Sequence, residues 1–279
     1  MTAPPAREAF LAMIARSEEQ LDLAAAALLI ASEEYPDLDV NGYLSRLDAL
    51  AEEAKPLVSA GGDNPFAVID GLNHSLFRRA GFQGNVSDYF DPRNSYLNDV
   101  MDRRRGIPIT LSLIYLEVAA RLGFSLEGVG LPGHFIVRHA APGRHILIDP
   151  FHGGQILLPE DCQQRMKAAY GKEVHLEQRH LVPAGKMRIL ARMLNNLKWI
   201  YIQRQDHARA LSVIERLMAL SPGDPRLVRD RGLVRMKLSQ LGGAAADLEA
   251  YLARRPDADD AARVRGHFKA VRRLTAMLN

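Results

Sequence analysis

The sequence predicts an α+β domain followed by an all-α helical domain, and two observations favour this arrangement. The first is an apolar helical segment over residues 109–122, which is followed by several short β-prone runs. The second is a change of pattern near residue 187, beyond which the chain shows helical periodicity and no strand-like run. Strands confined to one part of a chain are typical of α+β or multidomain proteins, so we expect domains at residues 1–182 and 183–279.

The N-terminal part is expected to be helical. Apolar residues at helical spacing predict a first helix from residue 7 to about residue 32 and a second over residues 41–54. The run Gly61-Gly62-Asp63-Asn64-Pro65 separates the second from a third helix over residues 66–80. Residues 81–92 are expected to form a loop.

A buried helix and a small antiparallel sheet are expected next. Pro108 suits the first turn of a helix, and nearly every face from Ile109 to Leu122 is apolar, which indicates a buried helix. Gly123 follows as a C-cap glycine. The β-prone runs are separated by Pro-Gly turns and cover residues 126–131, 134–138 and 145–148, with a last strand expected at residues 174–181.

Three motifs in this region carry a resemblance to a known family. They are Arg105-Gly106-Ile107-Pro108, Leu131-Pro132-Gly133-His134-Phe135 and Asp149-Pro150-Phe151-His152-Gly153-Gly154. With the repeats described below, they resemble the bacterial SirB-type group, in which a transglutaminase-like domain, related to the papain-type cysteine peptidases, precedes tetratricopeptide (TPR) repeats. The resemblance covers almost the whole chain and implies the same two folds here.

The resemblance also implies a catalytic triad of which one member is missing. His134 and Asp149 fall on the family's histidine and aspartate, and we expect their side chains to be in contact. The family's cysteine falls on Pro108, which offers neither a nucleophile nor a proton. Thr110 is a candidate replacement, whereas Ser112 lies about 200° further around the helix. The resemblance therefore implies a remnant dyad.

Four further residues are binding candidates. Gly133 and His152 belong to the quoted motifs. Arg105 ends a run of three arginines, which is either a solvated charge cluster or an anion-binding group beside the site. Asn98 is either a binding residue or only a cap or turn residue.

No metal or cofactor is predicted. The chain has nine histidines, but none falls in a His-Glu-x-x-His pattern, and no Cys-x-x-Cys pair is present. Gly128-x-Gly130-x-x-Gly133 has the spelling of a dinucleotide fingerprint, but a strand is expected after it instead of the helix that would hold a pyrophosphate.

Composition indicates a soluble, cytoplasmic protein without a membrane partner. The hydrophobic content of 47% supports two folded cores. The single cysteine, Cys162, excludes an intramolecular disulfide and suits a reducing compartment; we expect it to be structural. We expect no secretory signal, and the longest apolar run, residues 23–31, is shorter than the roughly 20 residues of a membrane-spanning helix.

The C-terminal part follows a repeat of 34 residues. The first unit places Leu194, Leu197, Tyr201, Ala210, Ile214, Leu217 and Pro222 in the TPR pattern, and the shift gives Val228, Arg231, Arg235, Ala244, Leu248, Tyr251 and Pro256. Arg231 and Arg235 depart from the pattern, whereas Gly232 occupies the tight-packing position. We expect two repeats and a capping helix over residues 259–278; the alternative is a plain helical bundle.

Charge is divided unevenly between the two parts. Residues 181–279 contain 19 Lys and Arg against 9 Asp and Glu, a net charge of +10, whereas residues 1–180 contain 17 against 24, a net charge of −7. A basic half is suited to an acidic peptide or to nucleic acid, but no nucleic-acid-binding motif is present.

Three functions follow as hypotheses. The first is a non-catalytic protein that binds a protein or peptide partner. The second is a hydrolase or acyl transferase that uses His134 and Asp149 with Thr110 or water as nucleophile. The third is a nucleic-acid binder that uses the basic C-terminal half.

Overall fold

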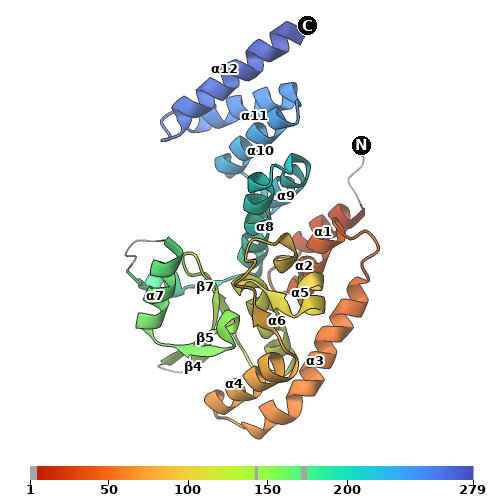
Figure 1. Cartoon of the computed structure of the whole chain (residues 1–279), viewed down its shortest axis with the longest axis vertical. Coiled ribbons are helices and arrows are strands. Elements are labelled where there is room, and N and C mark those ends of the chain that lie inside the picture. Colours follow the sequence, from red (N-terminus) through yellow and green to blue (C-terminus); the bar gives the residue numbers. More distant parts are fainter. Residues whose placement is uncertain (1–4, 142–143, 171–174, 279) are drawn as a thin grey trace. The chain divides into compact units, whose positions relative to one another are not determined.

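The computed structural model describes residues 5–141, 144–170 and 175–278, and the chain divides into two compact units, residues 1–193 and 194–279 (Figure 1). The predicted fold class is confirmed. The first unit combines helices with a small antiparallel sheet, and the described part of the second unit is helical. The domain boundary expected after residue 182 stays a prediction.

The N-terminal helices differ in part from the prediction. They are α1 (Pro5–Ile14), α2 (Leu23–Ser32), α3 (Val40–Ala60) and α4 (Pro65–Asn73), which continues into a π-helical turn, η1 (His74–Arg79). A single helix over residues 7–32 is therefore wrong. Residues 15–20 are exposed, and the Asp22 side chain accepts a hydrogen bond from the Ala25 backbone N–H at 2.9 Å, which begins a new helix.

The five-stranded sheet has the order β6-β5-β4-β3-β7, with every neighbouring pair antiparallel. Its strands are β3 (Glu127–Val129), β4 (Ile136–Ala141), β5 (Arg144–Asp149), β6 (Gln155–Leu157) and β7 (Pro183–Ala184). The first three match the expected runs within a few residues.

The strand expected at residues 174–181 is wrong for its described residues, and residue 174 lies outside them. Residues 178–181 form a 3-10 turn, η4 (Gln178–Leu181), in which the Glu177 backbone N–H donates to His180 Nδ1 at 3.1 Å. This local hydrogen bond competes with a strand ladder, because it satisfies the backbone inside the segment.

Helices cover both faces of the sheet. On one face, Val129, Ile136, Leu147 and Leu157 pack against Cys162 and Met166 of α7 (Pro159–Tyr170). The alternate residues Val137 and Ile148 are also buried and belong to the other face, where α6 (Pro108–Arg121) contacts β3 and β4. The expected buried helix is thus present, beginning at Pro108 itself.

Short elements connect the helices with the sheet. A two-stranded parallel pair joins β1 (Gln83–Gly84), which lies inside the region expected to be a loop, to β2 (Arg105–Gly106), which directly precedes α6. A 3-10 turn, η2 (Pro92–Asn94), and α5 (Leu97–Arg103) lie between them in the chain, and a second 3-10 turn, η3 (Pro150–His152), follows β5.

The second unit begins within α8 (Lys186–Gln203) and continues through α9 (His207–Leu220), α10 (Pro225–Lys237), α11 (Leu241–Arg254) and α12 (Ala261–Leu278). Gly232 occupies a tight contact, because a Cβ there would lie 3.0 Å from Leu248 Cδ2. Arg231 and Arg235, which depart from the repeat pattern, both form ion pairs with the buried carboxylate of Asp247. Among the described residues, no helix is both long and apolar enough to cross a bilayer.

Candidate functional site

The site is centred on the contact between His134 and Asp149. His134 lies in the turn that precedes β4, two residues before the strand, and Asp149 is the last residue of β5. His134 Nε2 lies 2.9 Å from Asp149 Oδ2, and the two residues are 7% and 0% exposed. The structure therefore brings together the two residues that the sequence motifs indicate.

Two other side chains reach the same carboxylate oxygen. His152 Nδ1 lies 2.7 Å and Arg165 Nε 3.1 Å from Asp149 Oδ2, while the Phe151 backbone N–H donates to Asp149 Oδ1 at 3.1 Å. Burial by itself raises the pKa of the Asp149 carboxyl, but the hydrogen bonds from His134 and His152 outweigh it and hold that pKa well below its usual range. Asp149 is therefore ionised at neutral pH.

The ionised carboxylate fixes the hydrogen-bonding role of each imidazole. His134 Nε2 and His152 Nδ1 act as donors, because a carboxylate can only accept. No hydrogen bond among the described residues involves His134 Nδ1. In the neutral ring this nitrogen carries the lone pair, so it is the atom that can take a proton from a bound molecule.

His134, Asp149 and His152 also form a group with metal-ligand chemistry, since their ligand atoms lie within 4.8 Å of one another. In the structure, however, both imidazoles donate to a single oxygen, and the Arg165 guanidinium already lies beside it. A cation bound there would be repelled by Arg165 and would break both hydrogen bonds. The arrangement is that of a hydrogen-bonded ion network.

Residues far away in the sequence hold the two turns that carry the site. Arg192 of α8 donates from Nη1 to the Leu131 carbonyl at 3.1 Å and from Nη2 to the His134 carbonyl at 2.8 Å. Gly133 completes this turn with φ = +71°. These contacts fix the backbone from which the His134 ring projects.

The turn after Asp149 is held from the helical side of the unit. Asn73 of α4 donates to the Gly154 carbonyl at 2.9 Å, and its own side-chain oxygen accepts from the Tyr115 hydroxyl at 3.0 Å. Gly154 has φ = +78°, and a Cβ there would lie 1.8 Å from Asn73 Oδ1. Any other residue at this position would have to displace the Asn73 side chain and adopt a strained positive φ.

Aromatic rings surround part of the dyad. The Phe151 ring lies edge-on to the His134 ring with centroids 6.0 Å apart, and Tyr89 lies edge-on to Phe151 at 6.1 Å. These rings reduce the contact of the dyad with water and strengthen its electrostatic interactions.

The expected nucleophile position offers no reactive group. Pro108 is buried at the start of α6. The Thr110 hydroxyl donates to the Asn94 carbonyl at 2.8 Å and accepts from the Ile107 backbone N–H at 3.1 Å, so it caps the helix. The Ser112 hydroxyl faces the Phe135 carbonyl at 3.5 Å. Among the described residues, no hydroxyl or thiol hydrogen-bonds to the His134 ring.

Cys162 is fully buried between α7 and the sheet. Burial, together with the negative charges of Asp161 and Asp149, raises the pKa of its thiol to about 11. The thiol therefore stays protonated and unreactive at neutral pH, which agrees with a structural role.

The other two binding candidates, Asn98 and Arg105, do not contact the dyad. Asn98 is buried in α5, and its Oδ1 atom has no hydrogen-bond partner in the described part of the chain. Arg105 is exposed on β2. Neither forms a hydrogen bond or an ion pair with His134, Asp149 or His152 in that same part.

Sequence reasoning missed Arg165, Arg192 and Asn73. Each comes from a helix, carries no motif, and reaches the site only through folding. One signal was available: Gly153 and Gly154 directly follow the Asp149 turn, and two consecutive glycines there indicate a backbone that needs positive φ.

Comparison with known proteins supports the same two-part organisation. Residues 41–195, more than half of the chain, match the model of the transglutaminase-like superfamily, and residues 197–268 match a tetratricopeptide-repeat model. A UPF0162 protein of Xylella fastidiosa (strain 9a5c) is 40% identical over 254 residues, which cover 90% of each chain. A UPF0162 protein of Vibrio cholerae is 27% identical over 240 residues, or 86% of this chain and 88% of the relative.

Another relative shares only part of the chain. F-box only protein 21 of Homo sapiens is 35% identical over 142 residues, which cover 47% of this chain and 21% of that protein. Together, the matches confirm the predicted combination of a transglutaminase-like domain and TPR repeats.

Proposed function

Because this chain belongs to the transglutaminase-like superfamily, in the bacterial SirB-type group that contains the UPF0162 proteins, we propose that it is a non-catalytic protein-interaction protein. In this proposal the transglutaminase-like domain is degenerate, and the TPR region binds a protein or peptide partner. The single cysteine and the absence of a membrane-spanning helix among the described residues agree with action in the cytoplasm.

The observation that carries this proposal is Pro108 at the start of α6, the position to which the resemblance assigns the family's nucleophilic cysteine. The nearest substitute in sequence, the Thr110 hydroxyl, is engaged by Asn94 and Ile107. Acyl transfer through a covalent intermediate needs a nucleophile beside its base, and the described residues do not supply one.

The intact dyad favours a second candidate, a hydrolase that activates water. Asp149 orients His134, and His134 Nδ1 is the ring nitrogen that could accept a proton from water. In this case Gly133, next to His134 in the chain, and His152, which contacts Asp149, would bind the substrate. Asn98 and Arg105 form no hydrogen bond or ion pair with the dyad among the described residues and are binding candidates from the sequence alone.

A paired assay separates these two functions. Wild type, His134→Ala and the control His145→Ala, whose histidine is exposed on β5, are compared for hydrolysis of p-nitrophenyl acetate and for transfer of monodansylcadaverine to casein. The non-catalytic proposal expects equal background rates from all three proteins. A rate that falls with His134→Ala by about tenfold or more, but not with His145→Ala, would establish the hydrolase instead.

The interaction function is tested with a partner in pure form. A protein recovered from a lysate with the full-length chain is purified, and its direct binding is measured by titration calorimetry. The proposal expects a saturable one-to-one complex in which the partner keeps its mass. A partner that returns cleaved or amide-modified with wild type, and unchanged with His134→Ala, would contradict it.

A further inference from the structure

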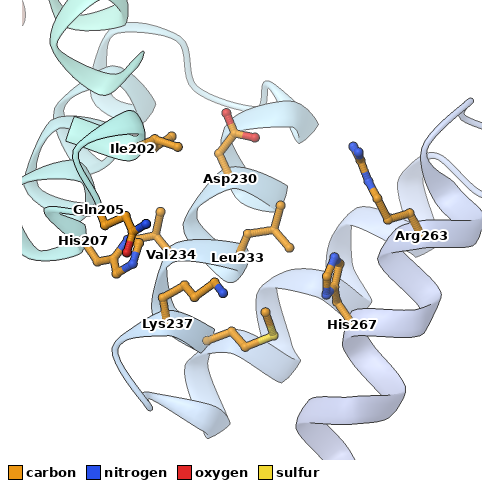
Figure 2. A pocket seen from close by; sticks show the side chains of 10 residues that line it. Ile202, Gln205, His207, Asp230, Leu233, Val234, Lys237, Arg263 and His267 are labelled. Atoms are coloured by element: carbon orange, nitrogen blue, oxygen red, sulfur yellow. The ribbon is translucent and has the colours of Figure 1, made fainter. Parts of the chain in front are cut away.

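The second unit contains a pocket of about 530 Å³ formed by the end of α8, the start of α9, and helices α10 and α12. Figure 2 shows Leu233 and Lys237 of α10 and Arg263 and His267 of α12 around it. All of its lining residues belong to this unit, so the pocket is a property of the helical part alone. Its size suits a few residues of a peptide rather than a folded surface.

Part of the pocket lining is apolar. Leu233, Val234 and Met236 of α10 contribute to it, and Ile202 at the end of α8 is 36% exposed beside them. An apolar side chain placed here would leave water without loss of any hydrogen bond. The pocket therefore offers an anchor for one aliphatic side chain.

The rim of the pocket carries uncompensated positive charge. Lys237 and Arg263 are exposed, and neither forms an ion pair among the described residues. His267 lies on α12 one turn from Arg263, and the buried Nδ1 of His207 has no hydrogen-bond partner in the described part of the chain. Among the described residues, the pocket thus holds two cationic side chains without an acidic partner and one imidazole nitrogen without a hydrogen-bond partner.

Asp230, the acidic residue in the pocket lining, does not neutralise the positive charge of Lys237 and Arg263. Asp230 accepts from Lys198 Nζ at 2.9 Å and from Arg229 Nη2 at 2.6 Å, so its own charge is already balanced. Helix α12 adds to the excess, since residues 261–278 contain five Lys and Arg and no Asp or Glu. An anionic ligand is therefore favoured.

We propose that this pocket binds an acidic linear peptide, which inserts an aliphatic side chain over Leu233 and Met236 and places carboxylates against Lys237 and Arg263. The proposal deepens the interaction function given above and rests on it. Single-stranded nucleic acid fits less well, because its bases stack best on large aromatic rings and the lining contains no Phe, Tyr or Trp, only the smaller imidazoles of His207 and His267.

The test measures binding of defined peptides to the full-length chain by fluorescence anisotropy. The probe is a fluorescein-labelled decapeptide of Asp and Glu with two central Leu residues. One comparison peptide carries Asn and Gln in place of the acids, and another carries Ser in place of Leu. A fluorescein-labelled deoxythymidine decamer serves as the nucleic-acid probe.

The variants separate the pocket from general charge. Arg263→Glu and Lys237→Glu change the rim, and Arg273→Glu makes the same change of charge on the same helix as Arg263 but outside the pocket. Ile202→Ser reduces the anchor at an exposed position. Circular dichroism melting verifies that each variant remains folded.

The proposal expects the acidic Leu peptide to bind, and both comparison peptides to bind about tenfold more weakly. Arg263→Glu, Lys237→Glu and Ile202→Ser should each weaken binding by about tenfold, and Arg273→Glu by much less. Equal losses with Arg263→Glu and Arg273→Glu, tighter binding of the oligonucleotide, or no peptide binding would each overturn the proposal.

These failures are distinct from failure of the interaction function. A purified partner that binds Lys237→Glu and Arg263→Glu as tightly as wild type would overturn the pocket proposal and leave the interaction function standing. Turnover that depends on His134 would instead contradict the non-catalytic function, whatever the peptide result.

Discussion

At the scale of single residues, Asp149 determines how the dyad region is organised. Its buried carboxylate accepts hydrogen bonds from two imidazoles, one guanidinium and one backbone N–H. Removing Asp149 or His134 leaves the other of these two buried groups without its partner, which costs more than the net worth of the contact itself. His134 and Asp149 therefore have a structural role that does not depend on a nucleophile.

Asp149→Asn is expected to destabilise the folded chain by about 3 kcal/mol at neutral pH. Folding lowers the pKa of the Asp149 carboxyl, so the ionised group stabilises the folded chain. This stabilisation is fully present above the unfolded carboxyl pKa of about 3.9 and is lost as the pH falls toward the pKa of Asp149 in the folded chain. Urea unfolding at several pH values should give a difference between wild type and variant that shrinks with acid. Asp63→Asn, an exposed control, should show no difference at any pH.

The Cys162 thiol should be unreactive in the folded protein. Its thiol is fully buried and has a pKa of about 11, so the reactive thiolate is rare at pH 8. Ellman's reagent is expected to modify the native chain only over hours and the chain in guanidinium chloride at once, with one thiol per molecule. Rapid modification of the native chain would show that the packing between α7 and the sheet opens readily.

At the scale of elements, local signals were sufficient where apolar or β-prone runs have clear boundaries. Helix α6 was predicted from a long apolar segment between Pro108 and Gly123, and the strands β3 to β5 were predicted within a few residues from short β-prone runs separated by Pro-Gly turns. The break between α1 and α2 was missed because the helical spacing of apolar residues continues across it. Only the N-cap residue Asp22 indicates that a new helix begins there.

Interactions across long sequence separations were not predictable. Arg231 and Arg235 were identified as departures from the repeat, but nothing local indicates that Asp247 compensates them. Arg165 and Arg192 likewise reach the dyad from helices without a motif. The motifs indicated which residues meet, whereas the residues that position them became apparent only in the folded chain.

The turn that follows Asp149 provides a matched test of backbone strain. Gly154→Ala should destabilise the chain by about 3 kcal/mol or more, because the new Cβ collides with Asn73 in addition to the cost of positive φ. Gly153→Ala has φ = +69° with open space around it, so it should cost only about 1 kcal/mol. Chemical denaturation of both variants measures the difference. Equal losses would mean that Asn73 moves aside freely.

At the scale of the whole molecule, α8 is the element that the two units share. Its first half belongs to the first unit and its second half to the helical unit. Ile189, Leu190 and Met193 in the first half are at most 3% exposed, and Arg192 holds the turn of His134. A domain that ended at residue 182 would contain all of the family motifs but would lack these contacts from the first half of α8.

Truncation decides where the transglutaminase-like domain ends. We expect residues 1–193 to unfold cooperatively and residues 1–182 to bind the dye ANS and lose near-ultraviolet circular dichroism. Each buried aliphatic side chain removed with the start of α8 contributes about 1.5–3 kcal/mol, which is a large share of a domain's stability. Equal urea midpoints for the two fragments would place the boundary after residue 182 and make α8 wholly part of the helical unit. A lower midpoint for the shorter fragment, with the His134 turn exposed to rapid amide exchange, would make the first half of α8 part of the site's own support.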